Sequence, residues 1–407
     1  MRSSLARMRR GSPLLIIFVC VFIDMLGYGM IVPLLPFLVP ERPDRALLVG
    51  LLSSIYALMQ LLVAPLLGAL ADRRGRRPVL LGCLLAASAA YALLGVAASV
   101  GSLPLLFVAL ALGGAAGASI PTAQAYIADS TPPEGRAQGL GLIGAAFGLG
   151  LMLGPALGGL LSSYGLGLPA FVAAGLALIN GLYGLLALPE SLPPERRTRQ
   201  PLRLGAVAGQ LVRALGERDV RPLLLAIFLL NLAFAGLQSN FPLFSSTRFG
   251  WNSLENGLFF AFVGLCAVLT QGLLLGRIQP LLGEPLLVLL GLGLMAGCLA
   301  LTALAPVGWA LYPLVGLMAG GTGLAIPSIT SLVSRQAGEG RQGAVMGGMQ
   351  SILSAALVLG PALAGLLFDR LGPAAPYLSG GLLAGGALLA AALGLWPTLR
   401  RSTFAIK

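Results

Sequence analysis

One acidic side chain is predicted to lie deep inside an apolar run. The chain has 407 residues and fourteen acids, and of these only Asp24 falls well within a stretch long enough to cross a membrane. A carboxylate in hydrocarbon is costly unless it takes up a proton or faces protein or water, so it is a candidate functional group. Tyr28 follows one helical turn later on the same face. We predict that Asp24 carries a proton; a carboxylate that only caps or hydrogen-bonds within a helix bundle is the alternative.

Other polar side chains inside apolar runs are candidates for contact with a small molecule. Each of them equally fits a hydrogen bond between helices. Few charges accompany them, so the pocket that they would line favours apolar, neutral or cationic compounds over strongly anionic ones, which need buried Arg or Lys. The predicted substrate-contacting residues are Asp24, Tyr28, Gln60, Gln124, Tyr126, Asn231, Gln238, Gln271, Tyr312 and Gln350.

The residue inventory argues against an enzyme. The chain has no histidine, which removes the commonest metal ligand and proton shuttle. Its four cysteines lie in predicted spans without paired spacing, so they are expected to be packing residues. No G-x-x-x-x-G-K-[ST] phosphate loop occurs. We therefore expect no metal, no cofactor and no catalytic residue, since one buried acid alone does not make an active site.

Residues 139–159, "GLGLIGAAFGLGLMLGPALGG", contain eight glycines and one proline without any charge. In water each interior glycine costs up to about 1 kcal/mol relative to alanine, so such a helix would be unstable. In lipid the backbone must bond internally, and small residues let helices approach closely. Gly150, Gly154 and Gly158 are four residues apart, so they share one face, which is predicted to pack against a span of the other half of the chain.

The elements that position these residues are predicted to be transmembrane helices. The chain is 57% hydrophobic and 10% charged, with a mean hydropathy of +0.92, against roughly 25% charged for soluble domains. Apolar stretches of about 20 residues, enough to cross a bilayer, recur throughout. Twelve spans are predicted, at residues 13–38, 47–71, 78–98, 103–128, 138–162, 168–189, 222–245, 254–276, 284–304, 307–334, 342–368 and 374–398.

The distribution of basic residues predicts the orientation of these spans. The net charge is +12, and 22 of the 26 Lys and Arg residues lie in the two termini and the even-numbered loops. This asymmetry follows the positive-inside rule and predicts that both termini are cytoplasmic, in a plasma or inner membrane. It also argues against nucleic-acid binding, which needs a basic soluble face. The basic N-terminus resembles a signal peptide, but its long apolar run predicts an uncleaved first span.

The two halves of the chain repeat each other at an offset of 206 residues. Gly154-Pro155 matches Gly360-Pro361, and Ile120-Pro121 and Pro36 have partners at the same offset. Asn231 lies within one residue of the position equivalent to Asp24. Parallel six-helix halves of this kind are the architecture of one large class of transporters. We predict an all-α membrane fold with an N-terminal half (1–189), a cytoplasmic linker (190–221) and a C-terminal half (222–407).

Four stretches of the sequence resemble motifs of drug efflux proteins in the major facilitator superfamily. Residues 139–159 contain G(x8)G(x3)GP(x2)GG, which resembles the fifth-span antiporter motif. The loop "GALADRRGRRP" at 68–78 resembles the superfamily's loop motif after the second span. The stretches "DMLGYGMIVPLLP" and "QAYIADSTPPEGRAQG" resemble the twelve-span proton antiporters that include the tetracycline exporters.

The resemblance implies which residues control the change between two facing states. The glycine-rich helices would seal the cavity between the halves. Asp72 would meet the positive end of a helix from the other half, and Arg76 would pair with a nearby acid. The implied conformational gate consists of Gly68, Asp72, Gly75, Arg76, Gly141, Gly150, Gly154, Pro155, Gly158, Gly159, Gly360 and Pro361.

We therefore expect a secondary active transporter that exports hydrophobic or cationic drug-like compounds in exchange for protons by alternating access. Its expected partners are a small-molecule substrate, protons and the lipid bilayer, and we expect a monomer. The fourth span departs from the exporters, because Leu110 stands where they usually carry an arginine. This keeps open an alternative, a facilitator or symporter of a small metabolite or lipid without proton antiport.

Overall fold

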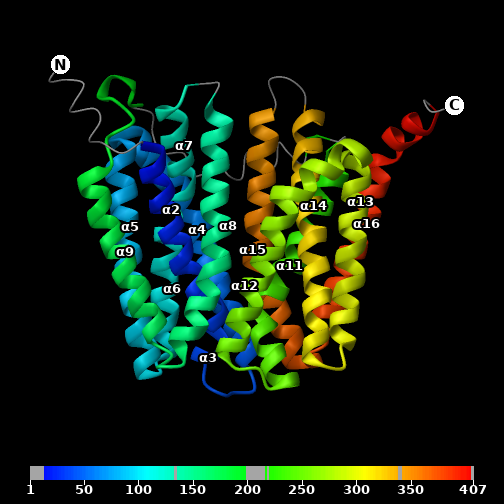
Figure 1. Ribbon diagram of the computed structural model, residues 1–407, viewed down its shortest axis with the longest axis horizontal. Coiled ribbons are helices and arrows are strands. Elements are labelled where there is room, and N and C mark those ends of the chain that lie inside the picture. Colours follow the sequence, from blue (N-terminus) through cyan, green and yellow to red (C-terminus); the bar gives the residue numbers. More distant parts are fainter. Residues whose placement is uncertain (1–12, 133–134, 199–215, 218–219, 338–341, 405–407) are drawn as a thin grey trace. The chain divides into compact units, whose positions relative to one another are not determined.

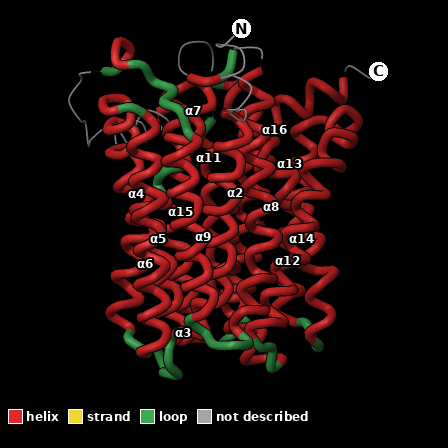
Figure 2. The backbone as a smooth tube through the Cα atoms, turned by 60° about the vertical axis from the view of Figure 1, so that its left-hand side comes forward, coloured by secondary structure: helices red, strands yellow, loops and turns green. Residues whose placement is uncertain are grey.

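The computed structural model describes residues 13–132, 135–198, 216–217, 220–337 and 342–404. Within these ranges the chain is helical and contains no β-strand, with loops that join the ends of the helices (Figure 2). The fold is therefore the predicted all-α one. Much of the predicted linker, at residues 199–215 and 218–219, lies outside the described residues.

The described chain contains eleven helices that are long and apolar enough to cross a membrane. One of them, Ser253–Leu304, has 52 residues, which at 1.5 Å per residue is far longer than one crossing of about 30 Å requires. Gly283 interrupts it with a left-handed backbone angle, φ 73°. The twelve predicted spans require this segment to cross the membrane twice, and the break at Gly283 is compatible with that.

The first half of the sequence forms long helices that prolines and glycines interrupt. Pro33 shortens the first helix, because proline lacks an N–H and favours a 3-10 turn here. The fourth predicted span breaks at Ala118–Ser119, just before Pro121. The elements are α2 (Pro13–Ile31), η1 (Val32–Leu34), α3 (Leu35–Leu38), α4 (Arg45–Arg74), α5 (Arg76–Val100), α6 (Leu103–Gly117), α7 (Ile120–Ser130), α8 (Arg136–Ser162), α9 (Leu168–Ala187) and η3 (Pro194–Arg196).

The second half has the same kind of elements (Figure 1). A π-helical turn at Thr270–Leu274 joins two helices, and the kink at Gly283 lies directly before residue 284, where the ninth span was predicted to start. The elements are α11 (Arg221–Phe249), α12 (Ser253–Leu269), η4 (Thr270–Leu274), α13 (Leu275–Leu304), η5 (Gly308–Ala310), α14 (Leu311–Gln336), α15 (Gln342–Leu371) and α16 (Ala375–Phe404).

Contacts divide the chain into two compact units. Unit 1 comprises Met1–Leu38, Ile55–Leu204 and Ser253–Ala261, and unit 2 comprises Val39–Ser54, Gly205–Asn252 and Phe262–Lys407. In unit 1, α2 packs mainly on α8 and α9, and α5 on α6 and α9. In unit 2, α11 packs on α15 and α16, and α13 on α14 and α16. The first turns of α4 and of α12 thus group with the other half's helices, and the predicted division at the linker stays a prediction.

Candidate functional site

Asp24 lies on α2 with only 9% of its surface exposed. Three tyrosines from three helices lie beside it. The ring of Tyr28 on α2 contacts that of Tyr56 on α4, with centroids 5.2 Å apart. Tyr91 on α5 packs against α2 at Gly27, where an added Cβ would lie 3.2 Å from its ring. Gly27 and Tyr28 follow Asp24 by three and four residues, so both contacts lie on the same face of α2 as the acid. The sequence predicted only Tyr28 as its neighbour.

Glycines of α6 make room for this group. Cβ atoms on Gly114 and Gly117 would collide with the backbone and the hydroxyl of Tyr56, respectively, so only glycine lets α4 lie so close. The side-chain amide of Gln60 donates to the Gly117 carbonyl at 3.0 Å, one turn along α4 from Tyr56. Leu110, one turn earlier on α6, is buried and apolar. In unit 1, the structure therefore brings Asp24, Tyr28 and Gln60 of the predicted set together.

The chemistry that this group offers is that of a weak acid among phenols. No cation or hydrogen-bond donor contacts the Asp24 carboxylate among the described residues. A buried carboxyl group without a cationic partner favours its protonated form or a cationic ligand. The three aromatic rings add faces that attract a cation. The group is thus suited to exchanging a proton or to holding a positively charged compound.

The remaining predicted residues of unit 1 do not join this group. Tyr126 is almost fully buried, belongs to the core cluster that includes Ile17 and Cys20, and donates to the Pro189 carbonyl at 2.9 Å. These contacts support a packing role. Gln124, on the same helix, is exposed.

The predicted residues of unit 2 are spread over several elements. Asn231 on α11 donates to the carbonyl of Ile227 in its own helix at 2.8 Å, and Gln238 on α11 is half-buried. Tyr312 on α14 belongs to an aromatic cluster, with ring centroids 6.0 Å from Trp251 and 5.2 Å from Phe262. Gln271 and Gln350 are exposed. The substrate-contacting role of all these residues stays a prediction.

The arginine-rich loop forms an ion-pair network in unit 1. Arg76 pairs with Asp72 at 2.6 Å and with Asp129 on α7 at 3.1 Å. Gly75 has a φ of 108°, a conformation that only glycine adopts readily. The carboxylate of Glu190 accepts from the N–H of Arg76 at 2.9 Å and so caps α5. The acid expected near Arg76 is thus Asp129, and the sequence did not predict the cap by Glu190.

Unit 2 contains the same pair with its charges exchanged. Gly283, like Gly75, precedes the first residue of the next membrane crossing and has a positive φ. Here that residue is Glu284, which is buried and pairs with Arg335 on α14. Asp129 and Arg335 are separated by 206 residues, the offset of the internal repeat. In each unit an ion pair therefore joins the start of one helix to a neighbouring helix. The base is at the helix start in unit 1, and the acid is there in unit 2.

The glycine face of α8 packs against α2. Cβ atoms on Gly150 and Gly154 would lie 2.6 Å from the Met25 Cβ and 2.7 Å from the Leu26 carbonyl oxygen. A Cβ on Gly158 would collide with the Met30 backbone. The expected partner of this face, a span of the other half, is therefore wrong for these three residues. The two helices can approach so closely because α8 has glycines on this face and α2 has Gly29 opposite them.

Pro155 and Gly159, also on α8, make the contact with a helix from the second half of the chain that was expected of the glycine face. A Cβ on Gly159 would lie 2.9 Å from the Ser253 carbonyl oxygen and 3.1 Å from the Gly257 Cα, in the first turns of α12. The Pro155 carbonyl lies against Gly257 as well. Gly68 and Gly141, by contrast, have no atom within 4 Å of an added Cβ. Only part of the predicted gate set is therefore tightly packed in this structure.

Helix α15 repeats this arrangement in unit 2. A Cβ on Gly360 would lie 2.7 Å from the Leu232 carbonyl oxygen on α11, and the Pro361 carbonyl lies against Gly50 on α4. A Cβ on Gly365, the counterpart of Gly159, would lie 2.8 Å from the Leu47 Cα. The internal repeat thus extends to the contacts of the first turns of α4 and α12.

Side chains at the helix ends fix these first turns. The Asp369 carboxylate on α15 accepts the N–H groups of Ala46 at 3.1 Å and Leu47 at 2.8 Å, and so caps the N-terminus of α4. For α12, the Ser162 hydroxyl lies 2.7 Å from that of Ser253. Nothing in the sequence pattern predicts the cap by Asp369, because the residues that it joins are more than 300 positions apart.

Fold and site together define a multi-pass membrane protein with an internal repeat and a buried acid. The family model described as Major Facilitator Superfamily matches residues 17–352. The chain belongs to the major facilitator superfamily, and it is a membrane transporter.

The relatives narrow the class. The chain is 35% identical over 357 residues to the class C tetracycline resistance protein of Escherichia coli, a match that covers 87% of this chain and 89% of the relative. It is 34% identical to the class B protein of the same organism, covering 87% and 88%. The solved structure of the human organic anion transporter MFSD10 (TETRAN) has a TM-score of 0.71 and 26% identity, covering 93% of this chain and 98% of that one. The resemblance to tetracycline exporters is confirmed.

Proposed function

We propose that this transporter exports hydrophobic or cationic drug-like compounds in exchange for protons. The observation that carries the proposal is Asp24, a buried acid on α2 beside Tyr28, Tyr56 and Tyr91. An antiporter driven by a proton gradient needs a group whose protonation differs between its two facing states. The similarity to tetracycline resistance proteins supports a drug-like substrate.

Coupling follows from competition for one carboxylate. When Asp24 is protonated, the site carries no charge and has little attraction for a cation. When Asp24 loses its proton, a cationic compound supplies the missing counter-charge and can stack on the aromatic rings. Proton and substrate therefore exclude each other, which is what obligatory exchange requires.

The close contacts of α8 and α15 supply the gate. Pro155 and Gly159 lie against the first turns of α12, and Pro361 and Gly365 lie against those of α4. We propose that these contacts separate when the transporter changes its facing state, and that the pairs of Arg76 hold the loop on the other side. Both termini are proposed to face the cytoplasm, on the charge distribution.

Leu110 favours a second candidate. The exporters that the chain resembles usually have an arginine at this position, and the structure has a buried leucine there. Without that arginine, Asp24 depends on burial and neutral neighbours alone. A facilitator or symporter of a small metabolite or lipid is the function that remains if protons are not exchanged.

Substrate-induced proton movement in proteoliposomes tests the choice. Purified protein is reconstituted with a pH-sensitive dye inside, and a panel of tetracyclines, hydrophobic cations and neutral metabolites is added under an imposed proton gradient. We expect tetracyclines or hydrophobic cations to accelerate the decay of the gradient, and neither protein-free vesicles nor Asp24→Asn protein to respond. Uptake of a panel compound without any proton movement would instead support the facilitator.

A further inference from the structure

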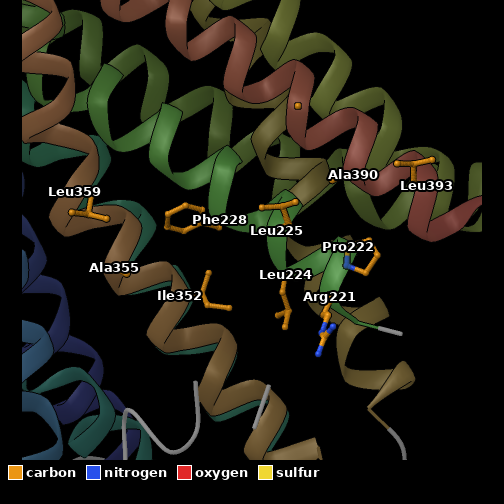
Figure 3. A pocket seen from close by; sticks show the side chains of 11 residues that line it. Arg221, Pro222, Leu224, Leu225, Phe228, Ile352, Ala355, Leu359, Ala390 and Leu393 are labelled. Atoms are coloured by element: carbon orange, nitrogen blue, oxygen red, sulfur yellow. The ribbon is translucent and has the colours of Figure 1, made fainter. Parts of the chain in front are cut away.

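Unit 2 contains an apolar groove that has no part in the site described above. Its walls come from α11, α15 and α16, and its volume is about 800 Å³, within the range of small-molecule sites. In Figure 3, Phe228 of α11 and Ile352 of α15 point into the space between their helices. None of the predicted substrate-contacting residues lines it. The groove is therefore a separate site.

The groove opens toward the surroundings of the helices. Leu224 and Ile352 are buried and form its floor, with 1% and 6% of their surfaces exposed. At its rim, Leu359 is 48% and Leu393 77% exposed. In a protein that spans a bilayer, exposed leucines on membrane helices face hydrocarbon chains. A lipid tail can therefore enter the groove from the side without crossing a polar barrier.

One end of the groove carries a positive charge. Arg221, the first residue of α11, lines it beside Pro222. A helix N-terminus adds to the positive potential there. A guanidinium has five N–H donors, so Arg221 can bind a phosphate while it keeps a contact within the protein. The charge distribution predicts that this end faces the cytoplasm, where anionic headgroups attract basic residues.

These observations share one chemistry, an apolar slot of about two helical turns with a cation at its interfacial end. We propose that the groove binds an anionic phospholipid of the cytoplasmic leaflet, with one acyl chain between α11, α15 and α16 and the headgroup phosphate on Arg221. A zwitterionic lipid offers the same chain but a headgroup without net charge. A hydrophobic transport substrate would fill the slot without needing Arg221.

Quenching of Trp396 by brominated lipids tests the proposal. Trp396 lies one turn beyond Leu393 on α16 and is 56% exposed, so lipid bound in the groove is within its reach. Protein with Trp251→Phe and Trp309→Phe is reconstituted with brominated phosphatidylglycerol or with brominated phosphatidylcholine at equal mole fractions. We expect a preference for phosphatidylglycerol of about fivefold, the contribution of one basic residue at an anionic surface.

Matched variants distinguish lipid bound in the groove from a general attraction of anionic lipids to the basic protein. Arg221→Gln should abolish the preference, while Arg277→Gln, which removes an exposed charge from α13, should keep it. Gly386→Leu fills the groove, where an added Cβ meets only Leu229 at 3.5 Å, and should reduce quenching by both lipids. Gly385→Leu, on the same helix, places its side chain in open space and should leave the quenching by both lipids unchanged.

Three results would overturn the proposal: equal quenching by the two lipids in the parent protein, a preference that survives Arg221→Gln, or quenching that Gly386→Leu leaves unchanged. If the tryptophan substitutions prevent folding, lipids retained by the protein with all its tryptophans are counted by native mass spectrometry. There, phosphatidylglycerol should stay bound to the Arg277→Gln protein and be lost from Arg221→Gln. Retention of phosphatidylglycerol by both variants would also contradict the proposed site.

Discussion

Single acidic side chains occupy the most specific positions in the structure of this transporter. Asp24 lies on the face of α2 that Tyr56 and Tyr91 cover, Glu190 caps α5, and Asp369 caps α4. The sequence predicted the depth of Asp24 from the length of the apolar run around it. It did not predict Tyr56 and Tyr91 as neighbours, because helices that are apolar on most faces give no periodicity that assigns a face to a partner.

Asp369→Asn should loosen the first turns of α4. The carboxylate accepts the N–H groups of Ala46 and Leu47, one on each oxygen. An asparagine amide has only one oxygen, so its NH2 group would face one of these N–H groups, and the loss of this hydrogen bond costs about 1 kcal/mol. Val49, in these turns, is 0% exposed. In a cysteine-free background, Val49→Cys should react with a thiol reagent about fivefold faster when Asp369→Asn is present. The control, Asp44→Asn, changes an acid that pairs locally with Arg42 and should have no effect.

At the scale of elements, close helix contacts follow the glycines but not always the expected partner. The face of Gly150, Gly154 and Gly158 packs closely, and its partner is α2 rather than the expected span of the other half. Spacing along one helix identifies a face, but it contains no information on which of many apolar helices covers that face. The boundaries of the spans were easier to predict, because bilayer thickness fixes their length.

Gly154→Leu should separate α8 from α2. An added Cβ would lie 2.7 Å from the Leu26 carbonyl oxygen and 2.8 Å from the Gly29 Cα, and neither backbone can yield without moving its helix. The protein should insert into the membrane but lose more than nine-tenths of its transport. Gly144→Leu, on the same helix with no atom within 4 Å of an added Cβ, is the matched control and should transport normally. Equal activity of the two variants would mean that the close contact is dispensable.

At the scale of the whole molecule, duplication explains features that no local pattern contains. The offset of 206 residues relates Pro155 to Pro361 and Asp129 to Arg335, while their partners Arg76 and Glu284 lie 208 residues apart. The repeat predicted two six-span halves, and the fold is that of the major facilitator superfamily. The exchanged charges of the two pairs were not predicted, because comparison of the halves by residue type conceals a pair in which both members change sign.

Thiol labelling tests the proposed orientation of the whole chain. In intact cells expressing a cysteine-free protein, Tyr164→Cys, at a position that is 80% exposed between α8 and α9, should react with an impermeant reagent from outside. Arg74→Cys, in the exposed arginine-rich loop, should react only after the membrane is opened. The split of 22 to 4 basic residues demands this result. Labelling of Arg74→Cys in intact cells would reverse the orientation.

The most direct test of proton-coupled export compares uphill transport with exchange in Asp24→Asn protein. Asparagine keeps the size and hydrogen bonding of the side chain but cannot titrate. In vesicles with an imposed proton gradient, this variant should fail to accumulate substrate above the outside concentration, while exchange of labelled for unlabelled neutral substrate across the membrane persists. Asp24→Glu should retain part of the accumulation, with a shifted pH dependence. Accumulation by Asp24→Asn at the parent level would contradict the account and leave the facilitator or another coupling ion as the explanation.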